Sequence, residues 1–290
     1  MDGLPSSYLA ATVTRREDHT DDLATFWLRP ERPVAFEPGQ YVTLVLPGAS
    51  GQWVKRPYSV LSAPHEGEIE LFVERVDGGE LTPSLFGLAA GDALGVRGRA
   101  AGAFARDGAC THHVMACTVT GIAPFLSMLR HAAADPASGA RGDRFLILYG
   151  ASTPADLGPY AAELQTFARG EHVSAVVTVS RPWEAPNWTG EAGRVEDVLR
   201  KHLDALEWPL EETAGYACGN PGMVSAVHGL LRRAGLDDAH LHEEAYFPDA
   251  GETAPGEAPP AAPPARRQGV TAAPPGGIVL KTAPRPPERD

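Results

Sequence analysis

The sequence has 290 residues, of which 43% are hydrophobic, enough for about two domains with sizeable cores. The formal net charge of −12 and the pI near 5.3 argue against a general nucleic-acid-binding protein. No apolar run approaches the roughly 18 residues that a membrane span needs, and no signal peptide is expected at the start of the chain.

The three cysteines, Cys110, Cys117 and Cys218, occur without paired spacing. This pattern favours reduced thiols in a cytoplasmic protein over a disulfide framework. The sequence contains no C-x-x-C or C-x₄-C run, so we expect neither an internal iron–sulfur cluster nor another metal site.

The first hundred residues have the pattern of short β-strands. Residues 41–46 and 68–74 are rich in β-branched and aromatic side chains, and the second run mostly alternates apolar and polar residues, as in a half-buried strand. Turn residues such as Pro38-Gly39 and Pro47-Gly48 flank these runs. The spacing favours an antiparallel barrel or sandwich with one short helix near residues 81–88.

From His112 onward, strand and helix patterns alternate, which is typical of an open, mainly parallel sheet with helices on both faces. An apolar run at 113–117 precedes a helix with Ile122, Phe125, Leu126 and Leu129 on one side. Further strands are expected at 144–149, 173–179, 215–218 and 240–246, and further helices at 155–168, 194–203 and 221–233.

The composition changes again after Phe247. Residues 248–290 are dominated by Pro, Ala, Gly and charged residues, so we expect a disordered, partly polyproline tail. The tail is either a docking arm for an unidentified partner or a solvated segment without a specific task. The sequence therefore predicts a β domain at 6–108, an α/β domain at 109–247 and a tail at 248–290.

Three segments of the predicted α/β domain follow strands, where ligands bind in open α/β sheets. Thr120, Gly121 and Pro124 lie at a strand–turn–helix junction, which suits a pyrophosphate but also an ordinary turn. Ser180 and Arg181 could bind an adenosine 2′-phosphate, or Arg181 could be a solvent-exposed loop residue.

The third segment is Cys218-Gly219-Asn220-Pro221. Asn220 can cap the next helix, with Pro221 at its first position, and Gly219 would let a flat ring approach the backbone. Cys218 would face the cleft, although a buried structural thiol is the more common role for such a residue.

In the β domain, Arg56-Pro57-Tyr58-Ser59 places a planar cation, an aromatic ring and a hydroxyl within four positions. Arg56 and Tyr58 would point the same way in a strand and could contact a phosphate and a flat ring. The same pattern fits a barrel strand with an exposed arginine. Gly79, Leu81, Thr82 and Ser84 could offer phosphate contacts, or the hydroxyls could simply cap a short helix.

Taken together and in this order, the motifs resemble the ferredoxin–NADP reductase family over about residues 6–247. The matching segments are Pro38-Gly39-Gln40 (P-G-Q), Arg56–Ser59 (R-x-Y-S), Gly102–Phe104 (G-x-F), Thr120–Pro124 (most of G-T-G-[IL]-A-P), Cys218–Pro221 (C-G-[NS]-P) and His242–Phe247 (the closing strand).

The resemblance implies a six-stranded antiparallel FAD-binding barrel followed by a five-stranded parallel sheet that binds NADPH, with NADH possible. It implies hydride transfer from nicotinamide C4 to flavin N5, followed by single-electron transfer to ferredoxin or flavodoxin. By analogy, Arg56 pairs with the FAD pyrophosphate, Tyr58 packs on the flavin ring and Ser59 lies near N5. Tyr246 or Phe247 covers the other flavin face, and Thr120, Gly121 and Cys218 line the nicotinamide path.

The sequence departs from the family pattern at Val119, which occupies the position of the first glycine of G-T-G. Its β-branched side chain narrows backbone access there. Alternatives to a ferredoxin or flavodoxin reductase are the reductase component of an oxygenase with a separate carrier, a free-flavin reductase, and an FAD-holding subunit with little NAD(P)H turnover.

Overall fold

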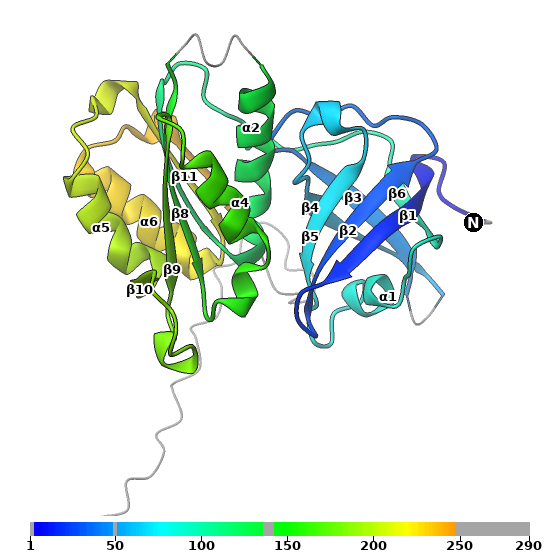
Figure 1. Ribbon diagram of the computed structural model, residues 1–290. Coiled ribbons are helices and arrows are strands. Elements are labelled where there is room, and N and C mark those ends of the chain that lie inside the picture. The colour runs from blue at the N-terminus through cyan, green and yellow to red at the C-terminus, as the bar shows by residue number, and fades with distance from the viewer. Residues whose placement is uncertain (1–2, 49–50, 136–141, 247–290) are drawn as a thin grey trace, which may run out of the picture. The chain divides into compact units, whose positions relative to one another are not determined.

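The computed structural model describes residues 3–48, 51–135 and 142–246. Its first part is a six-stranded antiparallel sheet with the strand order β4-β3-β6-β1-β2-β5 (Figure 1). The expected barrel is an open half-barrel, because this order makes β4 and β5 edge strands. The elements are β1 (Tyr8–Asp18), β2 (Leu23–Pro30), β3 (Tyr41–Pro47), β4 (Trp53–Ser59), β5 (Ile69–Glu74), α1 (Thr82–Phe86) and β6 (Ala93–Arg97).

Strand β5 differs from the half-buried pattern that its sequence predicts. Glu70 and Phe72, expected on an exposed face, are only 6% and 4% exposed. Phe72 packs edge-on against Tyr160, and Tyr160 donates a hydrogen bond to Glu70. Both faces of β5 are therefore covered, one by the half-barrel core and the other by side chains from the second half of the chain.

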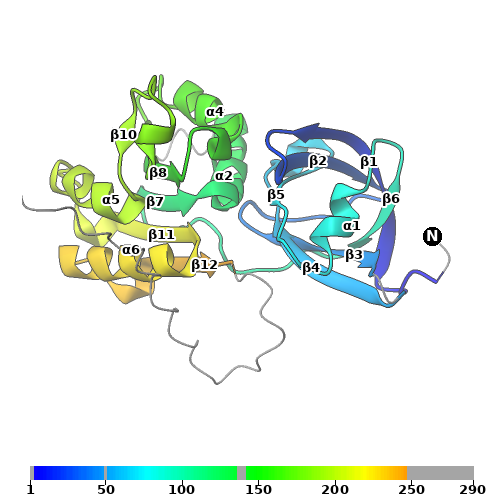
Figure 2. The same ribbon diagram turned by 90° about the horizontal axis from the view of Figure 1, so that it is seen from below.

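The second part is a six-stranded parallel sheet in the order β10-β9-β8-β7-β11-β12 (Figure 2). The five expected strands are present, and the short β10 at its edge is an addition that the sequence patterns did not indicate. The chain places β8 on one side of β7 and β11 on the other, so the topology reverses between β7 and β11. The strands are β7 (His112–Thr118), β8 (Arg144–Ala151), β9 (Val173–Val179), β10 (Glu191–Ala192), β11 (Thr213–Gly219) and β12 (Leu241–Ala245).

Helices cover both faces of this sheet, with α2 and α4 on one side and α5 and α6 on the other (Figures 1 and 2). The longer helices are α2 (Ala123–Ala134), α4 (Tyr160–Phe167), α5 (Val195–Asp204) and α6 (Pro221–Ala234). Short 3₁₀ segments are η1 (Pro64–Glu66), η2 (Val119–Ile122), η3 (Ala155–Leu157), η4 (Pro182–Glu184), η5 (Leu210–Glu212) and η6 (Asp238–His240).

The helix expected over 155–168 is instead split into η3 and α4. Gly158 between them has φ +56°, a left-handed conformation that a helix interior does not contain. Pro159 follows and cannot donate the backbone hydrogen bond that a continuous helix would need. A side chain on Gly158 would also lie 2.9 Å from the Phe72 ring, so the break brings the backbone close to β5.

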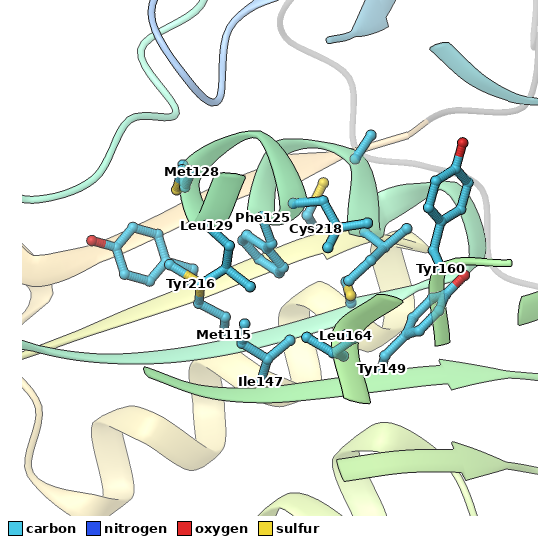
Figure 3. Packing of buried hydrophobic residues seen from close by; sticks show 14 of the residues in the cluster. Met115, Phe125, Met128, Leu129, Ile147, Tyr149, Tyr160, Leu164, Tyr216 and Cys218 are labelled. Atoms are coloured by element: carbon cyan, nitrogen blue, oxygen red, sulfur yellow. The ribbon is translucent and has the colours of Figure 1, made fainter. Parts of the chain in front are cut away.

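A continuous hydrophobic core joins the half-barrel to the α2–α4 face of the parallel sheet. Figure 3 shows part of this core on the side of the parallel sheet, including Phe125 and Tyr149. Leu61, Phe72 and Phe104 from the first half of the chain pack in one cluster with Phe125 of α2 and Tyr149 of β8. Because these side chains are at most 5% exposed, their burial holds the two sheets together as well as stabilising each.

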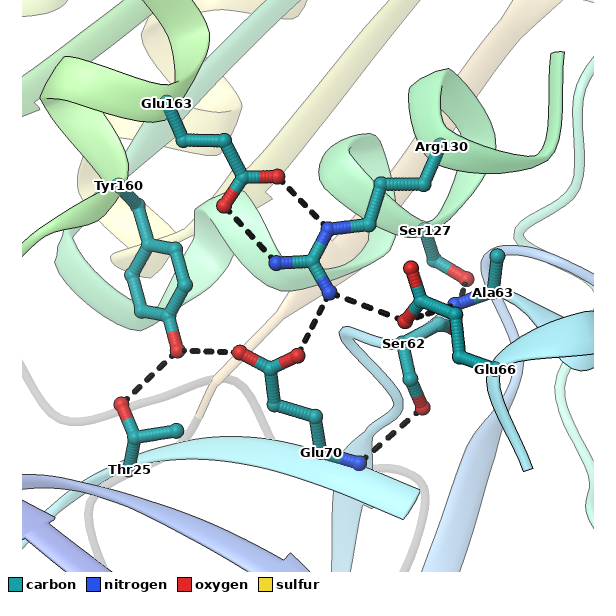
Figure 4. Close-up of polar contacts among 9 residues, drawn as sticks. All are labelled: Thr25, Ser62, Ala63, Glu66, Glu70, Ser127, Arg130, Tyr160 and Glu163. Atoms are coloured by element: carbon teal, nitrogen blue, oxygen red, sulfur yellow. Dashed lines mark hydrogen bonds and ion pairs between the residues drawn. The ribbon is translucent and has the colours of Figure 1, made fainter. Parts of the chain in front are cut away.

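Polar contacts reinforce the same junction (Figure 4). Arg130 of α2 bonds to Glu70 and Glu66 from the half-barrel and makes a two-pronged contact with Glu163 of α4. Ser127 donates to the Ser62 carbonyl at 2.7 Å. Burial alone would lower the pKa of Arg130, but its bonds to Glu163 and Glu70 raise it above the ordinary value, so the guanidinium stays charged.

No helix among the described residues combines the length and the apolar character needed to cross a bilayer. The predicted tail at 248–290 and Phe247 lie outside the described residues.

Candidate active site

A cleft with a volume of about 1140 Å³ lies where β4 and the loop after β5 meet the carboxyl ends of the parallel strands. It contains the point between β7 and β11 where the topology reverses, the usual ligand position in such sheets. The first turns of α2 and α6 reach the cleft through Ala123 and Met223, so two helix N-termini carry partial positive charge toward it. The cleft is large enough for an extended dinucleotide.

The Arg56–Ser59 segment lies in the cleft, as the sequence suggests. All four of its residues line the wall, with Arg56 and Tyr58 half-buried. Arg56 also forms an ion pair with the exposed Glu80 at 3.0 Å. The segment thus presents a guanidinium and an aromatic ring side by side, which suits a phosphate next to a flat ring.

The loop before α1 is less suited to phosphate than the sequence suggests. Leu81 and Thr82 line the cleft, whereas Gly79 and Ser84 do not. The Thr82 hydroxyl donates to the Val76 carbonyl and accepts from the Val76 amide, so it closes the loop on itself. Helix α1 has only five residues, so its N-terminus carries little dipole.

The turn after β7 combines cleft contacts with tight packing. Val119 and Thr120 line the cleft, whereas Gly121 and Pro124 are buried behind it. A side chain on Gly121 would meet the Cys218 carbonyl at 2.3 Å, so this glycine lets the turn pack on β11. Val119 has φ +46°, a left-handed conformation that is strongly unfavourable for a β-branched residue.

The turn after β11 confirms the predicted helix cap. The Asn220 side chain accepts from the backbone amides of Gly222 and Met223 at the start of α6. Gly219 has φ +125°, and a side chain there would lie 2.5 Å from the Thr118 hydroxyl. Gly219 and Asn220 line the cleft, whereas Pro221 does not.

Ser59, Cys218 and Tyr246 come from three different elements and meet at the cleft. The Ser59 hydroxyl lies 3.0 Å from the Tyr246 hydroxyl, and the Cys218 thiol donates to the same Tyr246 oxygen at 3.3 Å. Cys218 itself is fully buried and does not line the cleft. Burial raises the pKa of its thiol well above the ordinary value, so the group is a thiol and a poor nucleophile at neutral pH.

Sequence reasoning missed Glu244, the fourth member of this cluster. The Ser59 hydroxyl donates to Glu244 Oε1 at 2.6 Å. Burial raises the pKa of Glu244, while the bond from Ser59 partly lowers it. The available signal was its position two residues before Tyr246, because side chains two apart in a strand share a face.

The far end of the cleft holds Ser180 and Arg181 after β9. Arg194 and Glu196 at the start of α5, also missed from the sequence, lie in the same wall. Arg181 and Arg194 are 54% and 73% exposed, and each lies 3.7 Å from a nearby carboxylate, Glu184 and Glu196 respectively. This end therefore offers two exposed cations and one lining carboxylate to a nucleotide.

Comparison with known proteins agrees with this geometry. Residues 10–105 match the family model described as the oxidoreductase FAD-binding domain, and residues 115–229 match that described as the oxidoreductase NAD-binding domain. Ferredoxin–NADP reductase B of Sorangium cellulosum is 37% identical over 221 residues, covering 73% of this chain and 85% of that protein. The chain belongs to the ferredoxin–NADP reductase-like family of FAD- and NAD(P)-binding oxidoreductases.

Two further likenesses show the breadth of the family. The naphthalene 1,2-dioxygenase system ferredoxin–NAD(P)⁺ reductase component of Pseudomonas putida is 27% identical to this chain. The match covers 84% of this chain and 70% of that protein. A ferredoxin NADP⁺ reductase structure from Neisseria gonorrhoeae with bound FAD and NADP has a TM-score of 0.72 and 25% identity, covering 84% of this chain and 100% of that one. This protein is thus an FAD- and NAD(P)-dependent reductase that transfers electrons.

Proposed function

We propose that this flavoenzyme uses NADPH to reduce a separate one-electron carrier protein of the ferredoxin or flavodoxin type. The observation that carries the proposal is the shared cleft. It joins the Arg56–Ser59 segment of the half-barrel to the topological switch point of the parallel sheet. A flavin held by the Arg56–Ser59 segment would therefore lie beside a nicotinamide held at the switch point.

In this proposal, Arg56 pairs with the FAD pyrophosphate and Tyr58 packs against the flavin ring. When bound between these residues and the nicotinamide site, FAD would supply the redox chemistry that couples a two-electron donor to a one-electron acceptor. Ser59 and Glu244 form a polar pair at 2.6 Å that can hold a proton at Glu244 and orient the Ser59 hydroxyl. Cys218 acts as a buried donor that fixes the Tyr246 hydroxyl, rather than as a nucleophile.

The coenzyme assignment rests on the far end of the cleft. Arg181 and Arg194 supply two guanidinium groups for an adenosine 2′-phosphate, and Ser180 adds a hydroxyl. Glu196 in the same wall is the kind of residue that bonds a ribose 2′-hydroxyl in NAD enzymes. We assign NADPH as the preferred coenzyme because the cations outnumber this carboxylate, with NADH as a slower substrate.

The carrier is identified by reoxidation of the reduced enzyme. The protein is first reduced with NADPH without oxygen and then mixed in a stopped-flow instrument with a [2Fe–2S] ferredoxin, a [4Fe–4S] ferredoxin, a flavodoxin or free FMN. We expect at least one protein carrier to reoxidise the flavin with a second-order rate constant well above that for free FMN. A preference for free FMN over every carrier would instead identify a flavin reductase.

A second candidate is the reductase component of an oxygenase, favoured by the likeness to the Pseudomonas putida reductase component. Within these 290 residues, the three cysteines have no iron–sulfur spacing, so in this role the iron–sulfur cluster would have to come from outside them. The two candidates share the flavin and nucleotide chemistry and differ in the carrier. A strong preference for a Rieske-type ferredoxin in the same stopped-flow series would favour this second role.

A further inference from the structure

A cluster of metal-binding side chains lies at the amino edge of the parallel sheet, opposite the cleft. Asp107 and Cys110 come from the segment that precedes β7, and His240 and His242 lie at the end of η6 and in β12. None of the four lines the cleft. The carboxyl ends of β7 and β12 contribute to the cleft, so these two sites lie at opposite ends of the same strands.

Asp107, Cys110 and His240 converge on one another, and His242 lies beside Asp107. Asp107 Oδ2 lies 2.7 Å from His240 Nδ1 and 3.3 Å from His242 Nε2. The ligand atoms of Asp107, Cys110 and His240 all lie within 4.8 Å of each other. Cys110 is fully buried, while the other three side chains are 14% to 27% exposed, so an ion could enter from one side.

Local structure holds each member in place. Asp107 Oδ1 accepts from the Ala109 amide at 2.8 Å, which leaves Oδ2 directed at the histidines. Leu241 is extended, so His240 and His242 on either side of it share a face. The His242 ring stacks on Tyr216, with centroids 4.9 Å apart, and the Tyr216 hydroxyl accepts from the Asp107 amide.

We propose that Asp107, Cys110, His240 and His242 bind one zinc ion in a structural site. One thiolate, two imidazole nitrogens and one carboxylate form a donor set that Zn²⁺ accepts. Tetrahedral bonds of about 2.0–2.3 Å place neighbouring ligand atoms about 3.3–3.8 Å apart. Asp107, Cys110 and His240 already lie within 4.8 Å of one another, and rotation of the neighbouring His242 side chain would complete the set. The proposal replaces the expectation from the sequence that the chain has no metal site.

The site would connect two segments that matter for the cleft. Asp107 and Cys110 belong to the connection between the two sheets. His242 belongs to β12, the strand that carries Glu244, and His240 ends the 3₁₀ segment just before it. His240, His242 and Glu244 follow each other at every second position, so they share one face of an extended segment. Zinc would therefore anchor one end of β12 while its other end lines the cleft.

The test uses the purified flavoprotein after removal of metal with a chelator. Zinc chloride is titrated calorimetrically, and zinc content is then measured after dialysis. We expect about one zinc per chain, and X-ray absorption of the zinc form should show one sulfur and three nitrogen or oxygen neighbours. His240→Gln and Asp107→Asn should weaken binding by at least about tenfold, since even residues that only support ligands contribute this much.

The matched control is His65→Gln, which removes an exposed histidine in η1. Cys110→Ser is also informative, but substituting a buried residue could impair folding. The zinc affinity of His240→Gln, at a partly exposed position, is therefore the decisive measurement. A wild-type protein that takes up no stoichiometric zinc would overturn the proposal. So would equal zinc affinity of His240→Gln and His65→Gln, which would reduce the cluster to hydrogen bonds between Asp107 and the two histidines.

Discussion

At the residue scale, Val119 has the least favourable backbone. Among the described residues, it is the one non-glycine with positive φ, and it lines the cleft beside Thr120. A non-glycine residue held in the left-handed region costs roughly 1–3 kcal/mol, and a β-branched side chain is especially disfavoured there. The glycine that the family motif has at this position would avoid both the strain and the bulk.

Val119→Gly should therefore lower the KM for NADPH several-fold, with the net free energy of unfolding changing by no more than about 1 kcal/mol. Strain relief and the greater flexibility of glycine in the unfolded chain oppose each other in that free energy. Val119→Ala is the matched control, because it removes the branched side chain but keeps the strained φ. If the alanine variant equals the glycine variant in KM, bulk rather than backbone conformation limits binding.

Glu244 gives a prediction that depends on pH. Burial raises its pKa, so the native protein holds this proton more tightly than the unfolded chain does. Its contribution to stability is therefore lost as pH rises from the ordinary pKa through the raised one. Relative to wild type, Glu244→Gln should become more stable as pH rises through this window, with no further gain above it, as measured by urea unfolding.

The same carboxyl should affect the reaction. Glu244→Gln should slow carrier reduction by roughly 100-fold or more and remove an ionisation from the pH profile of the rate. Ser59→Ala removes the hydrogen bond that lowers the pKa of Glu244, so the same ionisation should move to higher pH. A profile that is identical in all three proteins would show that Glu244 does not take part.

Arg181 tests the coenzyme assignment. Hydrogen bonds to a charged group contribute about 1.5–3 kcal/mol, so Arg181→Ala should lower kcat/KM for NADPH by roughly 10–100-fold. The value for NADH should change little, because NADH lacks the 2′-phosphate. Arg194→Ala provides the comparison from the same wall of the cleft. An unchanged NADPH/NADH ratio in both variants would exclude 2′-phosphate recognition by this pair.

At the element scale, local patterns predicted the strands and most helices well. Asn220 followed by Pro221 indicated the start of α6, and the cap is present. The prediction of one helix over 155–168 was wrong, because Gly158-Pro159 interrupts it between η3 and α4. The exposed face expected for β5 was also wrong, because Tyr160 and Arg130 cover Glu70 from elements more than 50 residues away. Such long-range contacts leave no local periodicity.

The site residues also divide into those that a local motif indicates and those that only long-range contacts bring together. Arg56–Ser59 and Gly219-Asn220 were recognisable because they form contiguous motifs next to strands or turns. Arg194 and Glu196 were missed because only the folded chain brings them to the cleft, whereas Glu244 was missed although it lies two residues before Tyr246. Ser84 and Gly79 were placed in the site by motif alone, and the loop geometry keeps them out of the cleft wall.

Among the polar contacts between elements, those of Arg130 should have the clearest effect on the free energy of unfolding. Arg130→Met would leave the Glu70 carboxylate, whose side chain is 8% exposed, without its cation. Breaking such a buried pair costs about 3–5 kcal/mol. Arg29→Met is the control, because its pair with Glu68 is largely exposed and should contribute at most about 1 kcal/mol. Equal losses of unfolding free energy in both variants would contradict this assignment.

At the scale of the described molecule, residues 3–246 combine two sheets that share a hydrophobic core and one cleft. Neither sheet alone contains the Ser59, Glu244, Cys218 and Tyr246 cluster, because Ser59 comes from the half-barrel and the others from the parallel sheet. The electron-transfer function therefore depends on the junction being intact. For this reason, we expect Arg130→Met to slow flavin reduction as well as to lower stability.

The most direct test of the account is an anaerobic titration of the purified flavoprotein with NADPH, and separately with NADH, followed through flavin absorbance. NADPH should bleach the flavin at near-stoichiometric concentration, whereas NADH should require a larger excess. A protein that retains its flavin but is reduced by neither coenzyme would contradict the account, and would point to an electron-transfer subunit in which Val119 blocks nucleotide binding.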